Sequence, residues 1–199
     1  MRPRFKTYIT ARFLMRLLWR IKREGYENVP RDGALMMCAN HNSNLDPIFI
    51  AVTMAEFADL RFMAKKELFA FKPLAALLNW IGAFPVDRQS ADIKSAKTTM
   101  TILKEGGRLL VFPEGTRYLD GEIRAAKPGV GLFALRLGVT VLPVYITNKK
   151  RLFGKVRVIF GKPMVFNPPA GAKAGAELYQ QCADEIMDAI RALKNKTGL

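Results

Sequence analysis

Apolar and polar positions repeat along the chain with two periods, one typical of strands and the other typical of helices. Strands are predicted where apolar runs are short or alternate with polar residues, over residues 34–39, 108–112, 139–146 and 155–160. Helices are predicted where apolar positions recur every three or four residues, over residues 7–23, 47–58, 74–81, 91–105, 127–137 and 174–194. This alternation predicts an α/β fold, a single domain with a central mostly parallel or mixed sheet flanked by helices.

Particular residues mark where some of these elements begin. Asp46 stands before a proline and is expected to be the N-cap of the helix that follows it. Ser90 is expected to cap the helix over residues 91–105, whose inward-facing apolar stripe begins at Ile93. Residues 83–88 contain a proline, which cannot donate to a ladder, so they are expected to form a short edge strand or an extended turn.

The chain is long enough for one domain with a full hydrophobic core. It has 199 residues, half of them hydrophobic and a quarter charged, which is typical of a folded protein and too short for several domains. We expect residues 25–199 to form that domain and residues 1–24 to form a basic amphipathic helix ahead of it. Two cysteines, Cys38 and Cys182, are too few for a disulfide scaffold or a zinc cluster, which favours a reducing cytoplasm.

Neither a transmembrane helix nor a secretory signal is expected. The longest stretch without a charged residue, 73–86, has 14 residues, whereas a spanning helix needs about 20. The N-terminal residues mix arginines with apolar residues instead of placing a basic head before an apolar run. Any membrane contact is therefore predicted to be peripheral.

The net charge of +15 is concentrated in two segments. Residues 1–23 hold eight Lys or Arg and residues 123–176 hold ten, and neither segment contains an acidic residue. Arginines line one side of the predicted helix 7–23 and apolar residues line the next. That pattern suits an anionic membrane surface, but it also suits a helix packed on its own domain. Only the charge argues for nucleic acid, because the chain has no helix-turn-helix, zinc-finger or RNP-like pattern, so no nucleic-acid partner is expected.

His41 is the only histidine, and it lies in the polar loop that follows the predicted strand 34–39. An imidazole is the side chain whose ordinary pKa suits general-base chemistry near neutral pH. Asp46 follows five positions later, so a folded-back loop can bring its carboxylate to one ring nitrogen and leave the other to accept a proton. The alternatives are a surface histidine and a plain helix cap. Since Ser43 lacks the glycine elbow of a serine nucleophile, the reacting hydroxyl is expected to belong to the substrate.

Two further segments carry charged residues beside predicted strands. Residues 112–117 place Glu114, Gly115 and Arg117 close together, and the glycine would let the backbone approach a ligand. Arg88 adds a second guanidinium, whose planar donors suit phosphate oxygens. Taken singly, each of these is an ordinary solvated loop.

Taken in order, four blocks resemble the glycerolipid acyltransferases typified by lysophosphatidic acid acyltransferase. They are Asn-His-Asn-Ser-Asn-Leu-Asp at 40–46, Gly-Ala-Phe-Pro-Val-Asp-Arg at 82–88, Phe-Pro-Glu-Gly-Thr-Arg at 112–117 and Val-Leu-Pro-Val-Tyr-Ile at 141–146. Lys-Lys-Glu-Leu at 65–68 also looks like a family segment. The resemblance covers about residues 25–165 of the chain.

The resemblance implies transfer of a fatty acyl group from acyl-CoA or acyl carrier protein to the free hydroxyl of a lysophospholipid, above all lysophosphatidic acid. His41 would take the hydroxyl proton and Asp46 would orient the ring. The substrate site would be shaped and charged by Glu114, Gly115, Thr116, Arg117, Arg88 and Lys65. No metal or other cofactor is implied, and the enzyme would act peripherally on the cytoplasmic side of the cell membrane.

Other hypotheses stay open at this point. A phosphate-free lysolipid such as a lyso-aminolipid could be the acceptor, with Arg88 and Arg117 paired to carboxylates instead. A non-catalytic basic domain that binds membrane or nucleic acid would share the charge and would not need a His–Asp pair. The basic segment 123–176 could also receive an acyl carrier protein, because such carriers are acidic.

Overall fold

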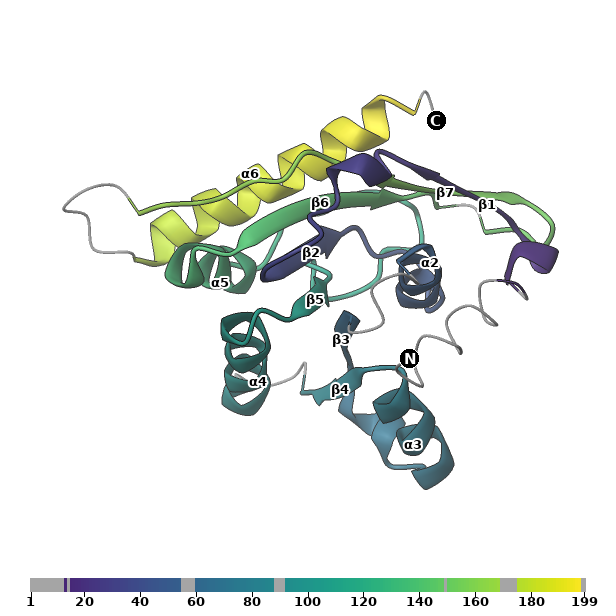
Figure 1. The fold of residues 1–199 in the computed structure, drawn as a ribbon, viewed down its shortest axis with the longest axis horizontal. Coiled ribbons are helices and arrows are strands. Elements are labelled where there is room, and N and C mark those ends of the chain that lie inside the picture. Colours follow the sequence, from purple (N-terminus) through teal and green to yellow (C-terminus); the bar gives the residue numbers. More distant parts are fainter. Residues whose placement is uncertain are drawn as a thin grey trace.

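A seven-stranded sheet forms the centre of the computed structural model, which describes residues 13, 15–54, 60–87, 92–148, 150–168 and 175–197 (Figure 1). The strands are β1 (Arg20–Glu24), β2 (Leu35–Ala39), β3 (Leu60–Lys65), β4 (Ala83–Val86), β5 (Arg108–Val111), β6 (Thr140–Ile146) and β7 (Lys155–Phe160). Their order across the sheet is β1-β7-β6-β2-β5-β3-β4, and every neighbouring pair is parallel except β6 with β7. The predicted α/β fold with a mostly parallel, mixed sheet is confirmed.

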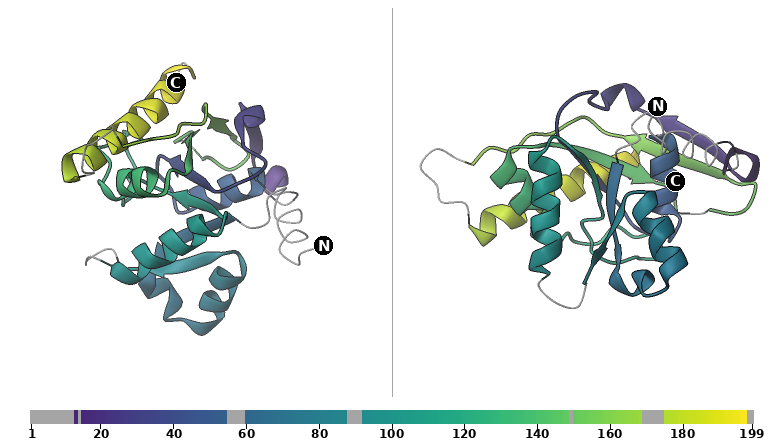
Figure 2. Two further views of the ribbon diagram at one scale, coloured as in Figure 1. Left: turned by 60° about the vertical axis from the view of Figure 1, so that its left-hand side comes forward. Right: turned by 60° about the horizontal axis from the view of Figure 1, so that its bottom comes forward.

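Helices cover both faces of this sheet (Figure 2). They are α2 (Asp46–Thr53), α3 (Lys72–Trp80), α4 (Ile93–Lys104), α5 (Gly129–Leu137) and α6 (Ala176–Asn195), with short 3-10 turns η1 (Tyr26–Asn28) and η2 (Lys66–Phe69). Side chains of α4, α5 and α6 pack in one apolar core, and side chains of α2 pack in a second one. Strand β2 supplies both cores, because successive side chains of a strand point to opposite faces.

The central strand β2 positions the loop that carries the candidate chemistry. All five of its residues are fully buried, with β6 on one side and β5 on the other. A parallel strand covered on both faces has a continuous apolar sequence, which is why the pattern predicted it. The loops that leave the carboxyl ends of β2, β5 and β6 therefore meet at one edge of the sheet, where ligand sites in such folds form.

The helix predicted over residues 7–23 is wrong at its C-terminal end. Residues 13 and 15–18 are helical, but Arg20–Glu24 form β1, which runs parallel to β7. The edge of β7 offers unpaired backbone groups to a neighbouring strand. In the extended chain, Ile21 packs against the core, while Arg20 and Lys22 on either side of it are exposed. The helix predicted for residues 1–24 therefore does not reach residue 24, and residues 1–12 lie outside the described residues.

Helix α4 begins later than predicted, and the first residue of its predicted apolar stripe lies outside the core. Asp92 caps it, because its carboxylate accepts the N–H of Ser95 at 2.9 Å, and the cap predicted at Ser90 falls outside the described residues. Ile93 is exposed, whereas Ala96, Met100 and Leu103 of the same predicted stripe pack in or against the core. Ser95 is also buried, and its hydroxyl donates to the carbonyl of Pro85 at 3.0 Å. The hydrophobic pattern misses strand β3. The strand has only six residues, and its buried and half-buried positions alternate without a clear apolar run.

Candidate active site

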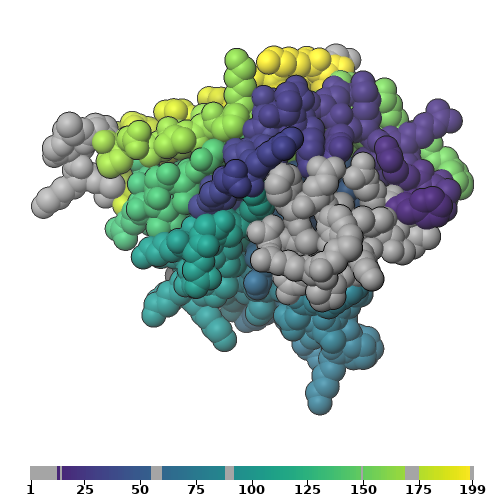
Figure 3. Space-filling view, in the orientation of Figure 1, coloured from purple at the N-terminus to yellow at the C-terminus, as the bar shows by residue number. Residues whose placement is uncertain are grey.

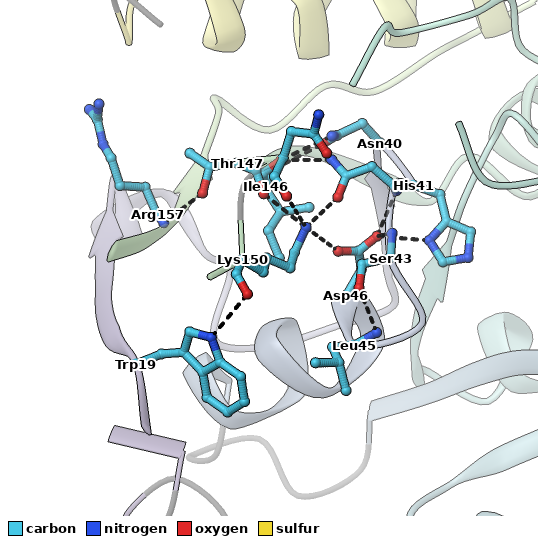
Figure 4. Close-up of polar contacts among 12 residues, drawn as sticks. Trp19, Asn40, His41, Ser43, Leu45, Asp46, Ile146, Thr147, Lys150 and Arg157 are labelled. Atoms are coloured by element: carbon cyan, nitrogen blue, oxygen red, sulfur yellow. Dashed lines mark hydrogen bonds and ion pairs between the residues drawn. The ribbon is translucent and has the colours of Figure 1, made fainter. Parts of the chain in front are cut away.

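His41 lies in the loop between β2 and α2, and this loop folds back as predicted (Figure 4). The Nδ1 atom of its ring is 2.9 Å from Oδ2 of Asp46. The same oxygen accepts the backbone N–H groups of Asn42 and Ser43, each at 2.7 Å. The side chains of His41 and Asp46 are only 5% and 0% exposed, so the pair is shielded from water and held in one geometry.

Asp46 is not the N-cap that the sequence predicted. It is the first residue of α2, and Leu45 occupies the cap position without a side-chain hydrogen bond. A capping carboxylate would accept an N–H from the turn that follows it. The carboxylate of Asp46 points back into the preceding loop instead, so the start of α2 directs it at His41.

A buried lysine completes the surroundings of Asp46. The Nζ atom of Lys150 is 2.7 Å from Oδ1 of Asp46, and its side chain is 5% exposed. Burial alone would raise the pKa of Asp46, but the hydrogen bond from His41 and the charge of Lys150 outweigh burial and hold that pKa below its usual value. Asp46 is therefore a carboxylate at neutral pH. From the sequence, Lys150 is only one member of a basic segment, because no neighbouring residue indicates that it pairs with Asp46.

The loop that follows β5 encloses His41 from other sides. The ring of Phe112 stacks on the imidazole, with the ring centroids 3.9 Å apart and the planes at 17°. Oε2 of Glu114 accepts the backbone N–H of His41 at 3.3 Å, and the N–H of Tyr118 donates to the His41 carbonyl at 2.9 Å. Burial raises the pKa of Glu114 to about 7. Glu114 thus acts here as an acceptor that fixes the backbone of His41.

A cavity of about 630 Å³ opens beside the His41 ring. Its apolar wall is built from β3, β4, α4, β5 and α5 by Met63, Val86, Ala96, Leu110, Val111 and Phe133. Polar and charged groups border it at Asp87, Asp92, Ser95 and Lys127. A volume of this size with mostly apolar walls and a few polar groups is typical of a small-molecule site.

The loop after β5 places its other predicted residues at different distances from the cavity. Gly115 borders it with a φ of +71°, and a Cβ atom at this position would lie 2.8 Å from the side chain of Lys127. Thr116 and Arg117 are exposed. The Nη1 atom of Arg117 donates to the side-chain oxygen of Asn44, so this guanidinium is tied to the loop that carries the His–Asp pair.

The structure places Lys65 away from the cavity and does not describe Arg88. Lys65 is exposed at the end of β3, with its ammonium 3.7 Å from the carboxylate of Glu67, and it is not among the residues that border the cavity. Arg88 lies outside the described residues. Lys127, which no sequence motif indicates, borders the cavity.

The cysteine thiols lie in the core, away from the His41–Asp46 pair. Cys38 and Cys182 are free and buried, and burial raises the pKa of both thiols. Over the ranges that the structure describes, no group of three or more His, Cys, Asp or Glu side chains could hold a metal ion. Within those same ranges, no helix combines the length and the apolar character that a membrane span requires.

The Acyltransferase family profile matches residues 20–147, a span that includes the His41–Asp46 loop. The chain belongs to the acyltransferase family. It is similar to the 1-acyl-sn-glycerol-3-phosphate acyltransferases of Bacillus subtilis (strain 168), at 32% identity over 148 residues, and of Streptococcus pneumoniae (strain ATCC BAA-255 / R6), at 30% identity over 171 residues. These alignments cover 72% and 80% of this chain. They span 73% of the Bacillus protein and 62% of the Streptococcus protein.

The fold of this acyltransferase is also that of a solved relative. The crystal structure of the 1-acyl-sn-glycerophosphate (LPA) acyltransferase PlsC from Thermotoga maritima matches it with a TM-score of 0.70 at 28% identity. The match covers 98% of this chain and 84% of that one. The protein is therefore an acyltransferase of the type that resembles the 1-acylglycerol-3-phosphate enzymes, and it contains the predicted pair of a histidine and an aspartate five positions apart.

Proposed function

We propose that this acyltransferase moves a fatty acyl group from a thioester, either acyl-CoA or acyl carrier protein, to the free hydroxyl of lysophosphatidic acid. The observation that supports the proposal most is the buried His41–Asp46 pair, whose ring borders an apolar cavity of ligand size. Relatives at about 30% identity carry 1-acyl-sn-glycerol-3-phosphate acyltransferase activity in their names. The family assignment covers acyl transfer, and the proposal adds the identity of the acyl acceptor and of the acyl donor.

His41 acts as the general base in the proposed reaction. Its Nδ1–H donates to Asp46, so Nε2 is the nitrogen that takes the hydroxyl proton of the acceptor. The hydroxyl oxygen bonds to the thioester carbonyl carbon, the C–S bond breaks, and the proton passes from the ring to the departing thiolate. The products are an ester and a free thiol. Between the two proton transfers, the carboxylate of Asp46 stabilises the imidazolium.

The acyl group passes directly from donor to acceptor in this mechanism, because a thioester is already activated. Ser43 belongs to the same loop, but its hydroxyl oxygen accepts the N–H of Leu45 at 3.2 Å and its own N–H is bound to Asp46. Both bonds shape the turn of the loop. Burial raises the pKa of the Cys38 thiol, which makes it a poor nucleophile. We therefore assign no covalent acyl-enzyme.

Arg117 is the proposed principal ligand of the acceptor phosphate. Its exposed guanidinium contacts Asn44 in the loop of the catalytic pair. Lys127, just before α5, borders the cavity itself and supplies a second cation. Arg88 and Lys65 are proposed to add to this set. Guanidinium groups suit the role because their planar donors match two phosphate oxygens at once.

The acceptor preference tests this proposal. The kcat/KM for lysophosphatidic acid should be at least about tenfold higher than that for a phosphate-free lysolipid with the same chain. The reason is that hydrogen bonds to a charged group contribute about 1.5–3 kcal/mol to binding. Arg117→Ala should remove much of this preference by raising KM. Lys104→Ala, an exposed lysine at the opposite end of α4 from the cavity, should keep it. The assay follows a labelled acyl group from acyl-CoA and, separately, from acyl carrier protein.

Each result of this assay has a distinct meaning. Equal kcat/KM on phosphate-bearing and phosphate-free acceptors would reject lysophosphatidic acid as the preferred acceptor and favour a lyso-aminolipid. Absence of acyl transfer from either thioester to every lysolipid would contradict the proposal as a whole. If the acidic carrier is the donor, its rate should fall with added salt, because exposed charges are screened over about 10 Å at 0.1 M.

We also propose that the protein docks peripherally on an anionic membrane, at its cytoplasmic side, through an exposed apolar tip. We call docking tip the residues Leu17, Leu18, Leu152 and Phe153, all of which are exposed. The N–H of Phe153 donates to the carbonyl of Leu18 at 2.7 Å, which joins the N-terminal segment to the loop between β6 and β7 at the right-hand end of Figure 3. Exposed Arg16 and Arg151 accompany the tip, so basic groups and apolar side chains occur together, as membrane interfaces require.

Phe153→Asn is expected to weaken binding to anionic vesicles about tenfold, because a large apolar side chain gains about 1.5–3 kcal/mol on burial. Phe153 holds a φ of +60°, which asparagine adopts more readily than a bulky residue does, so the fold should be kept. Val165→Asn, a similarly exposed side chain outside the tip, should bind like wild type. Sedimentation with and without anionic lipid measures the effect, and unchanged binding of the Phe153 variant would rule out the docking tip.

A further inference from the structure

Lys150 carries a buried charge that has no role in the proposed reaction steps. It lies three residues beyond the span that the family profile matches, in the loop between β6 and β7. Its ammonium group contacts four oxygens, those of the Asp46 carboxylate at 2.7 Å, the Thr147 carbonyl at 2.8 Å, the Asn148 carbonyl at 3.4 Å and the Asn42 side chain (Figure 4). These contacts hold the positive charge at one place, on the side of Asp46 away from His41.

We propose that Lys150 is a positioning residue that offsets the negative charge of Asp46, so that His41 stays a neutral imidazole able to accept a proton. This inference rests on the proposed general-base role of His41. It adds the residue that adjusts how strongly the ring holds a proton.

The distribution of contacts on Asp46 supports this role. Oδ2 faces His41 and the backbone N–H groups of the loop, and Oδ1 faces Lys150. A buried carboxylate without a counter-ion would strongly favour a positive imidazole beside it, because opposite charges attract more strongly where water is excluded. A ring that is already protonated cannot act as a base. With Lys150 in place, Asp46 can orient the ring without keeping a proton on it.

The charge of Lys150 depends in turn on Asp46. Burial lowers the pKa of Lys150, and its contact with Asp46 offsets part of that effect. Removing either charge would therefore leave the other one buried without compensation, which is costly. The pair is thus a matched unit behind the imidazole.

Trp19 contacts the segments that carry both partners of this ion pair. The Nε1 atom of Trp19 donates to the carbonyl of Lys150 at 3.3 Å. The same ring packs edge-on against Phe49 of α2, with the centroids 5.3 Å apart. Because α2 begins at Asp46, one aromatic side chain contacts the segments that carry both charges.

Other charged groups surround His41, and every variant at residue 150 contains all of them. Among the residues that the structure describes, those that touch it or share its cavity are Asp46, Glu114, Asp87, Asp92 and Lys127. Burial raises the pKa of Glu114 to about 7, so Glu114 titrates in the same range as an imidazole. A comparison between variants at position 150 therefore isolates the contribution of Lys150.

The single histidine of the chain makes the test direct, because NMR can follow its ring signal through a pH titration without substrate. In the wild-type protein the midpoint should be no higher than that of a free histidine, about pH 6.5. Lys150→Gln removes the charge and keeps hydrogen-bond donors, and it should raise the midpoint by about one pH unit. Lys150→Arg keeps the charge and should stay close to wild type. Lys162→Gln, an exposed lysine of the same basic segment, should also titrate like wild type.

Activity measurements and the titration separate the possible failures. A Lys150→Gln midpoint equal to that of wild type would overturn the role of Lys150, even if that variant lost thermal stability. A wild-type midpoint well above about pH 6.5 would overturn it too, and that measurement does not depend on the folding of any variant. In active protein, the acid limb of kcat/KM should move with the NMR midpoint. Failure of the proposed function would show separately, as full activity of His41→Ala or as wild-type protein without acyl transfer.

Discussion

Replacing His41 by alanine is expected to lower the rate of acyl transfer by about 10²–10⁴-fold, the usual contribution of a general base. The chain contains no second histidine that could take over the role, and the ring borders the cavity in which the acceptor hydroxyl is proposed to sit. Release of free thiol in a single turnover, with acceptor present at saturation, measures the chemical step without product release.

The fold of the His41→Ala variant should survive, which keeps this result interpretable. The backbone N–H and carbonyl of residue 41 would retain their hydrogen bonds to Glu114 and Tyr118. Circular dichroism and binding to anionic vesicles are the controls. Added imidazole should restore part of the rate by entering the space beside Phe112. A rate indistinguishable from that of wild type would reject His41 as the general base.

Replacing Asp46 by asparagine is expected to remove most of the activity and much of the stability. The neutral amide no longer stabilises the imidazolium that forms in the reaction. Its nitrogen must also face donors, either the loop N–H groups beside His41 or the ammonium of Lys150. The rate should therefore fall by about 10²–10⁴-fold. Lys150 would lose its counter-ion, and an unpaired buried charge costs about 3–5 kcal/mol in the free energy of unfolding.

A double variant separates these two losses. Asp46→Asn combined with Lys150→Gln removes both buried charges, so urea unfolding should show that much of the lost free energy of unfolding returns while the rate stays low. Asp184→Asn on the exposed side of α6 is the matched control and should change neither quantity. If Asp46→Asn alone proved as stable as wild type, the buried ion pair would be contradicted.

The elements that the sequence predicts well are those whose pattern is local. β2 is a continuous apolar run because both of its faces are buried, and α6 repeats apolar residues with helical spacing. β1 was predicted as helix because its basic and apolar residues also fit helical spacing, and only the open edge of β7 makes it a strand. The inward turn of Ser95 in α4 likewise depends on a distant carbonyl, that of Pro85.

The candidate site divides in the same way. His41 and Asp46 lie in one short loop, so five residues of sequence are enough to predict that their side chains meet. Glu114 is 73 residues from His41, and its role as an acceptor of the His41 N–H follows only from the adjacency of β2 and β5. Lys150 looks like part of a solvated basic run, and nothing in its neighbourhood along the chain indicates that it is buried.

By itself the sequence determined the fold class, the family resemblance and the His–Asp pair, because each depends on residues close together in the chain or on the order of short blocks. Only the tertiary structure decided that Asp46 is shared between His41 and Lys150, and that Phe112 and Glu114 enclose the ring. The physical reason is that burial and ion pairing are set by which strands become neighbours. The order of strands β6, β2 and β5 brings together three loops that are far apart in the chain.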